Sequence, residues 1–361
     1  MRRAQLVVVG GGPAGLSAAA VAAGLGAEVM LVDDNETLGG QLIKQTHKFF
    51  GDKGHYCGVR GVDIATILSE RAGEHSVTVL SATSVVGLYP GKVLGLANGD
   101  SFRKLGFESL VIATGAAENS IPFPGNDLPG VYGAGAVQTL MNVYGVRPGR
   151  RVLMVGSGNI GVIVSYQLLQ AGIDVAAVVE ALPAVGGYHV HAAKLVRLGV
   201  PILTSHTVKA ALGAESVTGA VICRVDGRFR PVAGTDRRLK VDTICVAVGL
   251  TPLAELLWQA GCRMFHVPEL GGHVAWHDEY METSQPGIFV AGDVSGIEEA
   301  STAMLEGRVA GARAWERLNR RTRESRDIID SARLELGSIR KGPFGEKATC
   351  GKQRLAECVP A

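Results

Sequence analysis

The stretch that decides the fold runs from Leu6 to Asp33 and reads LVVVGGGPAGLSAAAVAAGLGAEVMLVD. Its apolar residues 6–9 predict a short strand buried inside a parallel sheet. The small residues from Leu16 to Gly24 predict a helix that can pack closely on that sheet. Residues 29–32 are again all apolar and predict a second buried strand. The stretch is therefore a strand–helix–strand crossover, the unit from which parallel sheets are built.

The turn that joins the first strand to the helix is Gly10-Gly11-Gly12-Pro13-Ala14-Gly15, which fits the pattern G-x-G-x-x-G. Gly10 permits a tight turn, Gly12 lets the backbone approach a pyrophosphate, and Gly15 lets the helix press against the strand. The start of the helix offers N–H groups and a partial positive charge to phosphates. Asp33, which ends the second strand, can accept hydrogen bonds from ribose hydroxyls. Together these features predict a dinucleotide-binding crossover.

The same pattern returns in the second part of the chain. A strand at 151–155 leads into Gly156-Ser157-Gly158-Asn159-Ile160-Gly161, a helix over 162–170 and a strand that ends at Glu180. A carboxylate there favours an unphosphorylated ribose, because a 2′-phosphate would meet negative charge. We therefore expect NAD(H) rather than NADP(H) in this copy. The alternative is a degenerate pocket that holds no nucleotide.

Three more strands frame the domain organisation. They are expected at 110–115, at 242–249 and at 287–293, and each ends on a glycine or an acid. The pattern predicts an α/β fold with two Rossmann-like three-layer domains, one inserted into the other. The predicted boundaries are residues 1–118 and 250–330 for the discontinuous domain, 119–249 for the inserted domain and 331–361 for a C-terminal tail. The sequence from Glu316 onward begins with a cluster of arginines at 317–326 and has two open interpretations: a solvated charged helix with a loose end, or a docking segment for another subunit.

The composition excludes several classes of protein. Apolar residues make up 47% and charged residues 19% of the 361, and the net charge of +2 gives no electrostatic case for nucleic-acid binding. The six cysteines are scattered without a C-x-x-C pair, and the histidines lack metal-site spacing, so no metal is expected. No stretch has the length and hydrophobicity of a membrane span or a targeting signal, and cytoplasm is the expected location.

With both glycine turns placed, residues 4–318 resemble the two-dinucleotide-binding flavoproteins, the pyridine nucleotide–disulfide oxidoreductase-like superfamily. The resemblance rests on the two turns and Asp33, together with Ala113-Thr114-Gly115 and Ala291-Gly292-Asp293. It implies that the discontinuous domain binds FAD, with Asp293 on the ribityl chain, and that the inserted domain binds NAD(H). The residues expected at FAD are Gly10, Gly12, Pro13, Ala14, Gly15, Asp33, Gly40, Gln41, Ala113, Thr114, Gly115, Gly292 and Asp293. The residues expected at NAD are Gly156, Gly158, Asn159, Ile160, Gly161, Glu180 and Gly249.

A narrower resemblance concerns residues 39–51, the second glycine turn and Gly186-Gly187-Tyr188. These segments are similar to the FAD/NAD-binding alpha subunits of multi-subunit amine and amino-acid dehydrogenases or oxidases. That group includes sarcosine oxidase, dye-linked proline dehydrogenase, opine oxidase and hydrogen cyanide synthase. As partners the resemblance implies a second flavoprotein subunit, together with an iron–sulfur subunit, and it implies an amine or amino-acid substrate that is handled indirectly. The chain lacks the cysteine pair of the disulfide reductases, so an oxidoreductase without a redox-active disulfide is expected.

Lys44 and His47 follow the Gly39-Gly40 pair at the position where the family places chain beside the flavin ring. A lysine or histidine there could hydrogen-bond the flavin edge or protonate a leaving group, which makes both of them flavin-proximal candidates. The alternative is that these polar residues face solvent. No other residue is predicted to be catalytic, since the two cofactors carry the chemistry.

The leading hypothesis is hydride transfer between nicotinamide and flavin, in one subunit of an amine or amino-acid dehydrogenase or oxidase. It requires the two cofactors to meet face to face. Two alternatives stay open: a non-catalytic interaction subunit with structural nucleotide sites, and direct amine oxidation at the chain's own FAD.

Overall fold

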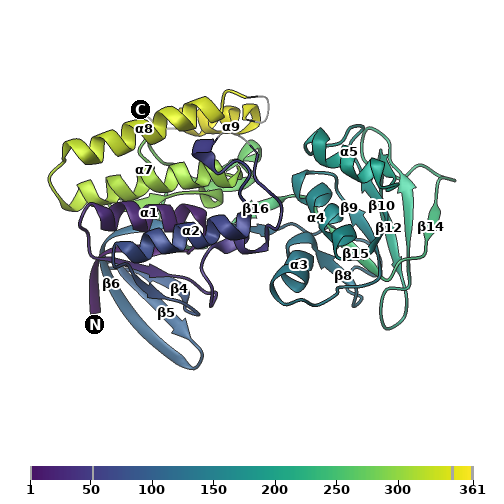
Figure 1. Ribbon diagram of the computed structural model, residues 1–361, viewed down its shortest axis with the longest axis horizontal. Coiled ribbons are helices and arrows are strands. Elements are labelled where there is room, and N and C mark those ends of the chain that lie inside the picture. Colours follow the sequence, from purple (N-terminus) through teal and green to yellow (C-terminus); the bar gives the residue numbers. More distant parts are fainter. Residues whose placement is uncertain (1, 51–52, 343–344, 359–361) are drawn as a thin grey trace. The chain divides into compact units, whose positions relative to one another are not determined.

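The computed structural model describes residues 2–50, 53–342 and 345–358, which divide into two compact units. Unit 1 comprises the described residues of 1–43, 48–117 and 251–361, and unit 2 comprises 44–47 and 118–250 (Figure 1). Both are α/β units built on a parallel sheet. The predicted fold class, two Rossmann-like domains with one inserted into the other, is confirmed. The short segment 44–47, which the sequence-based division placed in the discontinuous domain, packs with unit 2 instead.

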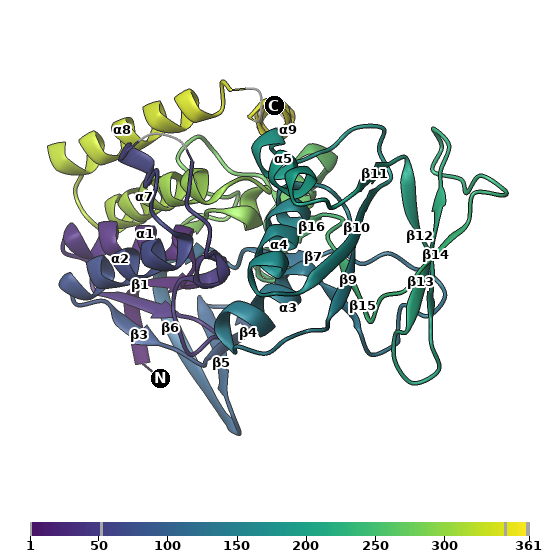
Figure 2. The same ribbon diagram turned by 45° about the vertical axis from the view of Figure 1, so that its right-hand side comes forward.

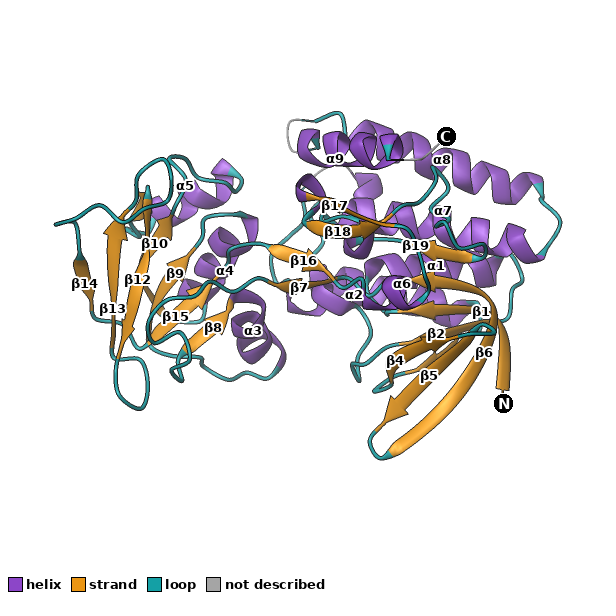
Figure 3. Cartoon of the chain, turned by 180° about the vertical axis from the view of Figure 1, so that it is seen from behind, coloured by secondary structure: helices purple, strands orange, loops and turns teal. Residues whose placement is uncertain are grey.

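Unit 1 is organised around a sheet with the strand order β3-β2-β1-β6-β5-β4, and β19 pairs with residues 110–112 at the carboxyl end of β6. The pairings among β1, β2, β3, β6 and β19 are parallel, and the hairpin β4–β5 extends the sheet antiparallel to β6 (Figure 3). The bounds are β1 Arg2–Val9, β2 Val29–Val32, β3 Thr78–Leu80, β4 Ser84–Tyr89, β5 Val93–Asn98, β6 Ser101–Ile112 and β19 Ile288–Val290. Residues 6–9 and 29–32 are buried throughout, as expected for strands covered on both faces.

The remaining elements of unit 1 cover this sheet and build its edges. Helices α1 and α7 lie side by side, and α8 packs on α7 (Figure 1). The helices are α1 Pro13–Gly24, α2 Gly61–Glu74, α6 Glu255–Gln259, α7 Ala300–Leu318, α8 Arg323–Ile339 and α9 Glu346–Glu357. Short 3-10 turns are η1 Gly40–Lys44, η2 Lys53–His55, η4 Pro268–Leu270 and η5 Asp293–Ser295. Two small sheets pair β7 Ala116–Glu118 with β16 Leu250–Pro252 and β17 Met264–Val267 with β18 Gly272–Ala275.

The close packing of α1 on α7 depends on glycines of α7. A Cβ added at Gly307 would lie 2.1 Å from the Ala14 carbonyl oxygen, and one at Gly311 would lie 2.3 Å from that of Ala18. Both distances are far below any real contact, so only glycine lets the two backbones approach this closely. The helix that carries the first glycine turn is thus held between the sheet and α7.

Unit 2 repeats the arrangement with a five-stranded parallel sheet in the order β11-β10-β9-β15-β8. Its strands are β8 Val131–Gly133, β9 Arg151–Val155, β10 Asp174–Glu180, β11 Ile202–Thr204 and β15 Thr243–Val246. Its helices are α3 Ala134–Gln138, which continues into the π-helical turn η3 Thr139–Val143, α4 Asn159–Gln170 and α5 His189–Arg197. A separate antiparallel sheet contains β12 His206–Leu212, β13 Gly219–Arg224 and β14 Arg237–Leu239.

The parallel sheet of unit 2 is the middle of three layers, as Figure 2 shows. Along β9 the side chains alternate: Val152 and Met154 join a core with the helices, while Leu153 and Val155 join a core with the antiparallel sheet. Both faces are buried, which explains the uninterrupted apolar run that the sequence shows at this strand.

The C-terminal tail differs from the loose end that was one of its two interpretations. Residues 346–357 form α9, whose inner face carries Ala348, Gly351 and Leu355, and Leu355 is buried in a small core with Leu270. The sequence concealed this helix because only three small or apolar residues make its contact face. Residues 343–344 and 359–361 lie outside the described part of the tail.

Candidate dinucleotide sites

The first glycine turn of unit 1 lies between the carboxyl ends of β1 and β6, where the strand order reverses. Gly10 has φ of 103°, and a Cβ there would lie 2.2 Å from the Ala113 carbonyl oxygen. A Cβ at Gly15 would lie 1.8 Å from the Gly10 carbonyl oxygen. These two glycines are therefore required by the backbone itself. In open parallel sheets, such a reversal of strand order is where ligands bind.

Gly12, between them, faces open space. The nearest atom to a Cβ placed at Gly12 is Gly40 Cα at 3.9 Å. Gly12 is also the N-cap residue of α1, with no side-chain cap and no acidic residue in the first turn, and Pro13 follows it. The start of α1 thus has neither a capping side chain nor an acidic residue in its first turn. The residues present fit a phosphate group.

Gly39 and Gly40 form the opposite side of this cradle. The Gly39 N–H donates to the Gly11 carbonyl at 2.8 Å, and a Cβ at Gly40 would lie 2.8 Å from Gly12 Cα. Both have positive φ, at 119° and 55°. Gln41 follows them with an exposed side chain, so the structure is compatible with a role for its backbone.

Asp33 is buried and holds the glycine turn. Its Oδ2 accepts from the Gly11 N–H, and its Oδ1 accepts from the Asn35 backbone N–H at 2.8 Å and side-chain amide at 3.1 Å. A carboxylate oxygen has two lone pairs, so Oδ2 keeps one acceptor position for a ligand hydroxyl. The sequence suggested the ribose role but not the bond to the turn.

The Gly292–Asp293 motif meets the glycine turn directly. Gly292 has φ of 78°, and a Cβ there would lie 2.9 Å from the Ala14 Cβ. Burial raises the pKa of Asp293 to about 6, assisted by the neighbouring Glu306 and Glu298 carboxylates and opposed by a hydrogen bond from the Glu298 N–H. Asp293 is therefore only partly protonated at neutral pH and can accept hydrogen bonds there.

The Ala113–Gly115 segment has a structural task. The Thr114 hydroxyl donates to the Leu253 carbonyl at 2.7 Å, and the Leu253 N–H donates to the Gly115 carbonyl at 3.0 Å. Among the described contacts, this segment touches the glycine turn only through its backbone, where Ala113 lies against Gly10.

Unit 2 repeats the main backbone contacts of this cradle. A Cβ at Gly156 would lie 2.1 Å from the Ala247 carbonyl oxygen, and one at Gly161 would lie 2.1 Å from that of Gly156. Gly158 is the N-cap of α4 without a side-chain cap, and a Cβ placed on it would have nothing within 4 Å. The Gly187 N–H donates to the Ser157 carbonyl at 2.8 Å, as Gly39 does to Gly11. A phosphate fits here on the same grounds.

Glu180 takes the position in unit 2 that Asp33 takes in unit 1. Its Oε2 accepts from the Ser157 N–H and hydroxyl, both at 2.8 Å, and Oε1 accepts from the Leu182 N–H at 2.9 Å. Oε1 thus keeps one acceptor position for a ligand hydroxyl. The Asn159 side chain has a structural contact, because its Oδ1 accepts from the Tyr188 N–H at 2.8 Å and holds the loop around Gly187.

Gly249 lies at the end of unit 2, apart from the turn contacts described above. It has φ of 117°, and its carbonyl accepts from the Asn119 N–H at 3.0 Å. The structure thus gives Gly249 a role in closing the ends of unit 2. Ile160 is half-buried at the start of α4 and packs against its hydrophobic core.

Lys44 and His47, the flavin-proximal candidates, belong to unit 2. The Asn142 side chain donates to the Lys44 carbonyl at 2.8 Å, and the ring of His47 lies edge-on to that of His191 at 6.1 Å. Burial, with His191 and Lys194 nearby, lowers the pKa of His47 to about 4, so it is neutral at pH 7. Burial also lowers the pKa of Lys44, which Glu118 partly offsets. A neutral His47 cannot supply positive charge to a flavin.

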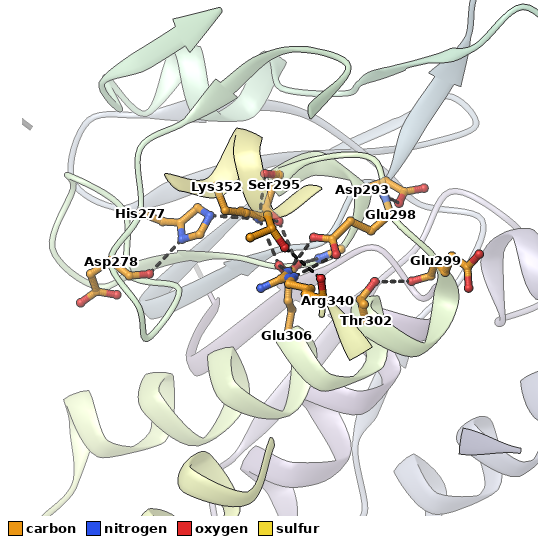
Figure 4. Close-up of polar contacts among 12 residues, drawn as sticks. His277, Asp278, Asp293, Ser295, Glu298, Glu299, Thr302, Glu306, Arg340 and Lys352 are labelled. Atoms are coloured by element: carbon orange, nitrogen blue, oxygen red, sulfur yellow. Dashed lines mark hydrogen bonds and ion pairs between the residues drawn. The ribbon is translucent and has the colours of Figure 1, made fainter. Parts of the chain in front are cut away.

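A buried ionic cluster behind Asp293 was missed by sequence reasoning. Glu306 lies in contact with Arg340 and Lys352, two residues of the tail, and with Ser295 (Figure 4). The only signal in the sequence was the acid at 306 inside a predicted helix, with no indication of its distant partners. His277 is also part of this cluster.

Other candidate chemistries receive no support from the described residues. All six cysteines are free thiols, and burial raises the pKa of the Cys245 thiol well above its usual range. Within the part of the chain described, no group of three or more histidine, cysteine or acidic side chains could hold a metal ion. Nor does any described helix combine the length and apolar character needed to cross a bilayer.

Comparison with known proteins shows the family of the chain. Residues 4–307 match the family model described as pyridine nucleotide-disulphide oxidoreductase. The chain belongs to this family. It is also 27% identical over 328 residues to an opine oxidase subunit of Rhizobium meliloti, with 86% of the chain and 62% of the relative covered. It is 31% identical over 315 residues to the alpha subunit of sarcosine oxidase from Rhizobium meliloti strain 1021, covering 83% of the chain and 29% of the relative.

Among solved structures, L-proline dehydrogenase from P. horikoshii superposes on this family member with a TM-score of 0.71 at 24% identity. The match covers 91% of the chain and 59% of that protein, and it supports the fold. The chain thus spans 62% and 29% of the two curated relatives. Both relatives are named as subunits, and the chain is homologous to subunits of multi-subunit oxidases.

Proposed function

We propose that this family member binds FAD in unit 1 and NAD(H) in unit 2, and that it serves as one subunit of an amine or amino-acid dehydrogenase or oxidase. When bound, the two cofactors would supply hydride exchange between nicotinamide and flavin. The observation that carries the proposal is the repetition in both units of one glycine turn whose helix has no side-chain cap, with a carboxylate bonded to the N–H of the second residue of each turn.

The chain's own residues would bind and orient. Gly12 and Gly158 leave room for a pyrophosphate against the N–H groups of α1 and α4. Asp33 and Glu180 each keep an acceptor position for ribose hydroxyls while bonded to the turn. Asp293, which begins the turn η5 after β19, would accept from the ribityl chain.

Support for NAD(H) over NADP(H) comes from Glu180. Its carboxylate occupies the position that a 2′-phosphate would approach, and Ala181, Leu182 and Pro183 follow it without a cation. The names of the relatives support a partner protein and an amine or amino-acid substrate. The partners proposed are a second flavoprotein subunit, together with an iron–sulfur subunit.

The test is an absorbance spectrum of the purified chain before and after addition of NADH or NADPH without oxygen. We expect bound FAD whose absorbance bleaches with NADH and recovers with an artificial acceptor. Protein that binds no FAD refutes the proposal. FAD that NADH never bleaches favours the interaction subunit, and bleaching by N-methyl amino acids alone favours direct amine oxidation.

A further inference from the structure

The turn that would hold the ribityl chain is anchored from behind by one buried carboxylate. Glu306 Oε2 accepts from the Gly292 N–H at 2.9 Å and from the Ser295 hydroxyl at 2.8 Å. Gly292 and Ser295 flank Asp293, so this single oxygen fixes both ends of the turn η5. The Glu306 side chain is only 2% exposed, which makes its other contacts decisive.

The second oxygen of Glu306 is held by the tail. Oε1 lies 2.7 Å from the Arg340 guanidinium and 3.0 Å from Lys352 Nζ. Burial opposes the ionisation of Glu306, but Lys352 and Arg340 overcome it and lower its pKa to about 2. Arg340 also binds Glu298 through two hydrogen bonds, at 2.9 and 2.6 Å, so that it links the segment after the turn to the same carboxylate.

Lys352 contacts the turn directly as well. Its Nζ donates to the Ser295 carbonyl at 3.0 Å and to the Ser295 hydroxyl at 2.8 Å (Figure 4). It also lies 3.2 Å from His277 Nε2, while His277 Nδ1 faces the Asp278 carbonyl at 2.9 Å. A neutral His277 with its proton on Nδ1 satisfies both contacts. Burial first, and then Lys352, lower the pKa of His277 to about 4, so this neutral form persists at pH 7.

The position of Lys352 is set by the packing of α9. A Cβ at Gly351 would lie 2.7 Å from Leu270 Cγ, and Leu355 is buried with Leu270, Val267 and Val274. Gly351 therefore lets α9 approach closely enough for the lysine to reach the turn. Both Arg340 and Lys352 lie beyond residue 307, where the match to the family model ends.

We propose that Lys352 is a positioning residue of the flavin site. From the tail helix α9 it binds Ser295 and Glu306, and it thereby fixes the turn η5 that presents Asp293 to the ribityl chain. The inference rests on FAD binding in unit 1, as proposed above. It assigns the C-terminal helices an intramolecular role in holding the cofactor.

The test separates the two halves of FAD. The ADP half would lie on the Gly10–Gly15 turn, which Lys352 does not contact, and the flavin half would depend on η5. FAD affinity is measured by titrating the full-length apoprotein and following flavin fluorescence, and ADP affinity is measured by its competition with FAD. We expect Lys352→Met to raise the Kd for FAD about tenfold or more while the inhibition constant of ADP stays within about twofold.

The matched control is Lys347→Met, which removes an exposed lysine from the same helix. It is expected to leave both constants unchanged. The inference is overturned if Lys352→Met behaves like Lys347→Met, or if it weakens FAD and ADP equally, because the latter indicates general damage to unit 1.

Should Lys352→Met lack a cooperative melting transition, the milder Ser295→Ala decides. It removes one hydroxyl from the cluster and should raise the Kd for FAD about threefold without changing ADP. An unchanged Kd for FAD in that variant contradicts the inference. A wild-type chain that takes up no FAD refutes the proposed function itself, and the wild-type titration alone reveals that outcome.

Discussion

The two glycine cradles share their backbone contacts and differ in what surrounds them. In unit 1 the turn is enclosed: Gly292 lies against Ala14, Gly307 of α7 presses on the same residue, and the Glu306 cluster backs the neighbouring turn. In unit 2 the loop around Gly187 lies against the turn, where a Cβ added at Gly187 would lie 3.0 Å from the Asn159 nitrogen, and the described contacts show no glycine of a second helix pressed against α4. The same local motif is thus backed by a helix and an ionic cluster in unit 1 and, among the described contacts, lacks both of these neighbours in unit 2. A cofactor retained through many turnovers suits the first, and one exchanged in each turnover suits the second.

The strongest challenge to this comparison is to block each cradle in turn. Gly15→Ala places a Cβ 1.8 Å from the Gly10 carbonyl oxygen, and Gly161→Ala places one 2.1 Å from that of Gly156. We expect Gly15→Ala to weaken FAD binding at least about a hundredfold, and Gly161→Ala to abolish reduction by NADH while FAD is retained. Flavin content and NADH bleaching measure both. Loss of FAD in Gly161→Ala would show that the cradles are not independent.

The ionic cluster that backs the turn of unit 1 can be weakened at Glu306. Glu306→Gln keeps the shape of the side chain but leaves Arg340 and Lys352 buried beside a neutral group. We expect it to lower the free energy of unfolding by about 3 kcal/mol, measured by denaturant titration. Glu70→Gln, on an exposed position of α2, is the control and should change stability little. Equal free energies of unfolding for Glu306→Gln and the wild-type chain would mean that the ionic cluster does not stabilise unit 1.

The cradle of unit 2 can be examined through its selectivity between NADH and NADPH. Removing the carboxylate in Glu180→Ala should improve the use of NADPH relative to NADH by about tenfold, because the repulsion of a 2′-phosphate disappears. Reduction rates with both nucleotides give the ratio. Asp174→Ala, at the opposite end of β10, serves as the control. A ratio that stays fixed in Glu180→Ala would remove the support for NAD(H).

The smallest effect is expected from pH acting on Asp293. The pKa of Asp293 is about 6, above the usual range of an aspartate, so the folded protein favours the neutral carboxyl. The stability that this preference contributes at low pH is lost as pH rises through 6. The ionised form is the better hydrogen-bond acceptor for the ribityl hydroxyls. FAD affinity should therefore increase about threefold between pH 5 and about 7. Asp293→Asn should show a flat profile.

Local features of the fold could be predicted from the sequence, and distant contacts could not. The turn at 10–15 and its repeat at 156–161 have glycines whose spacing follows from backbone geometry, so their strands and helices were predictable. The link between Glu306 and Lys352 joins residues 46 positions apart through a helix with three small contact residues. Charge pairs of this kind leave no periodic signal. The placement of segment 44–47 in unit 2 was equally hidden, because its packing depends on Asn142 and His191, far along the chain.

In each unit, a backbone hydrogen bond joins the two points at which the chain passes to the other unit. In unit 1 the Leu253 N–H bonds to the Gly115 carbonyl, and in unit 2 the Asn119 N–H bonds to the Gly249 carbonyl, both at 3.0 Å. An insertion whose two ends touch perturbs its host as little as a short surface loop does. The same property predicts that residues 119–249 can be replaced with a tight turn while unit 1 still folds, with segment 44–47 losing its packing partners.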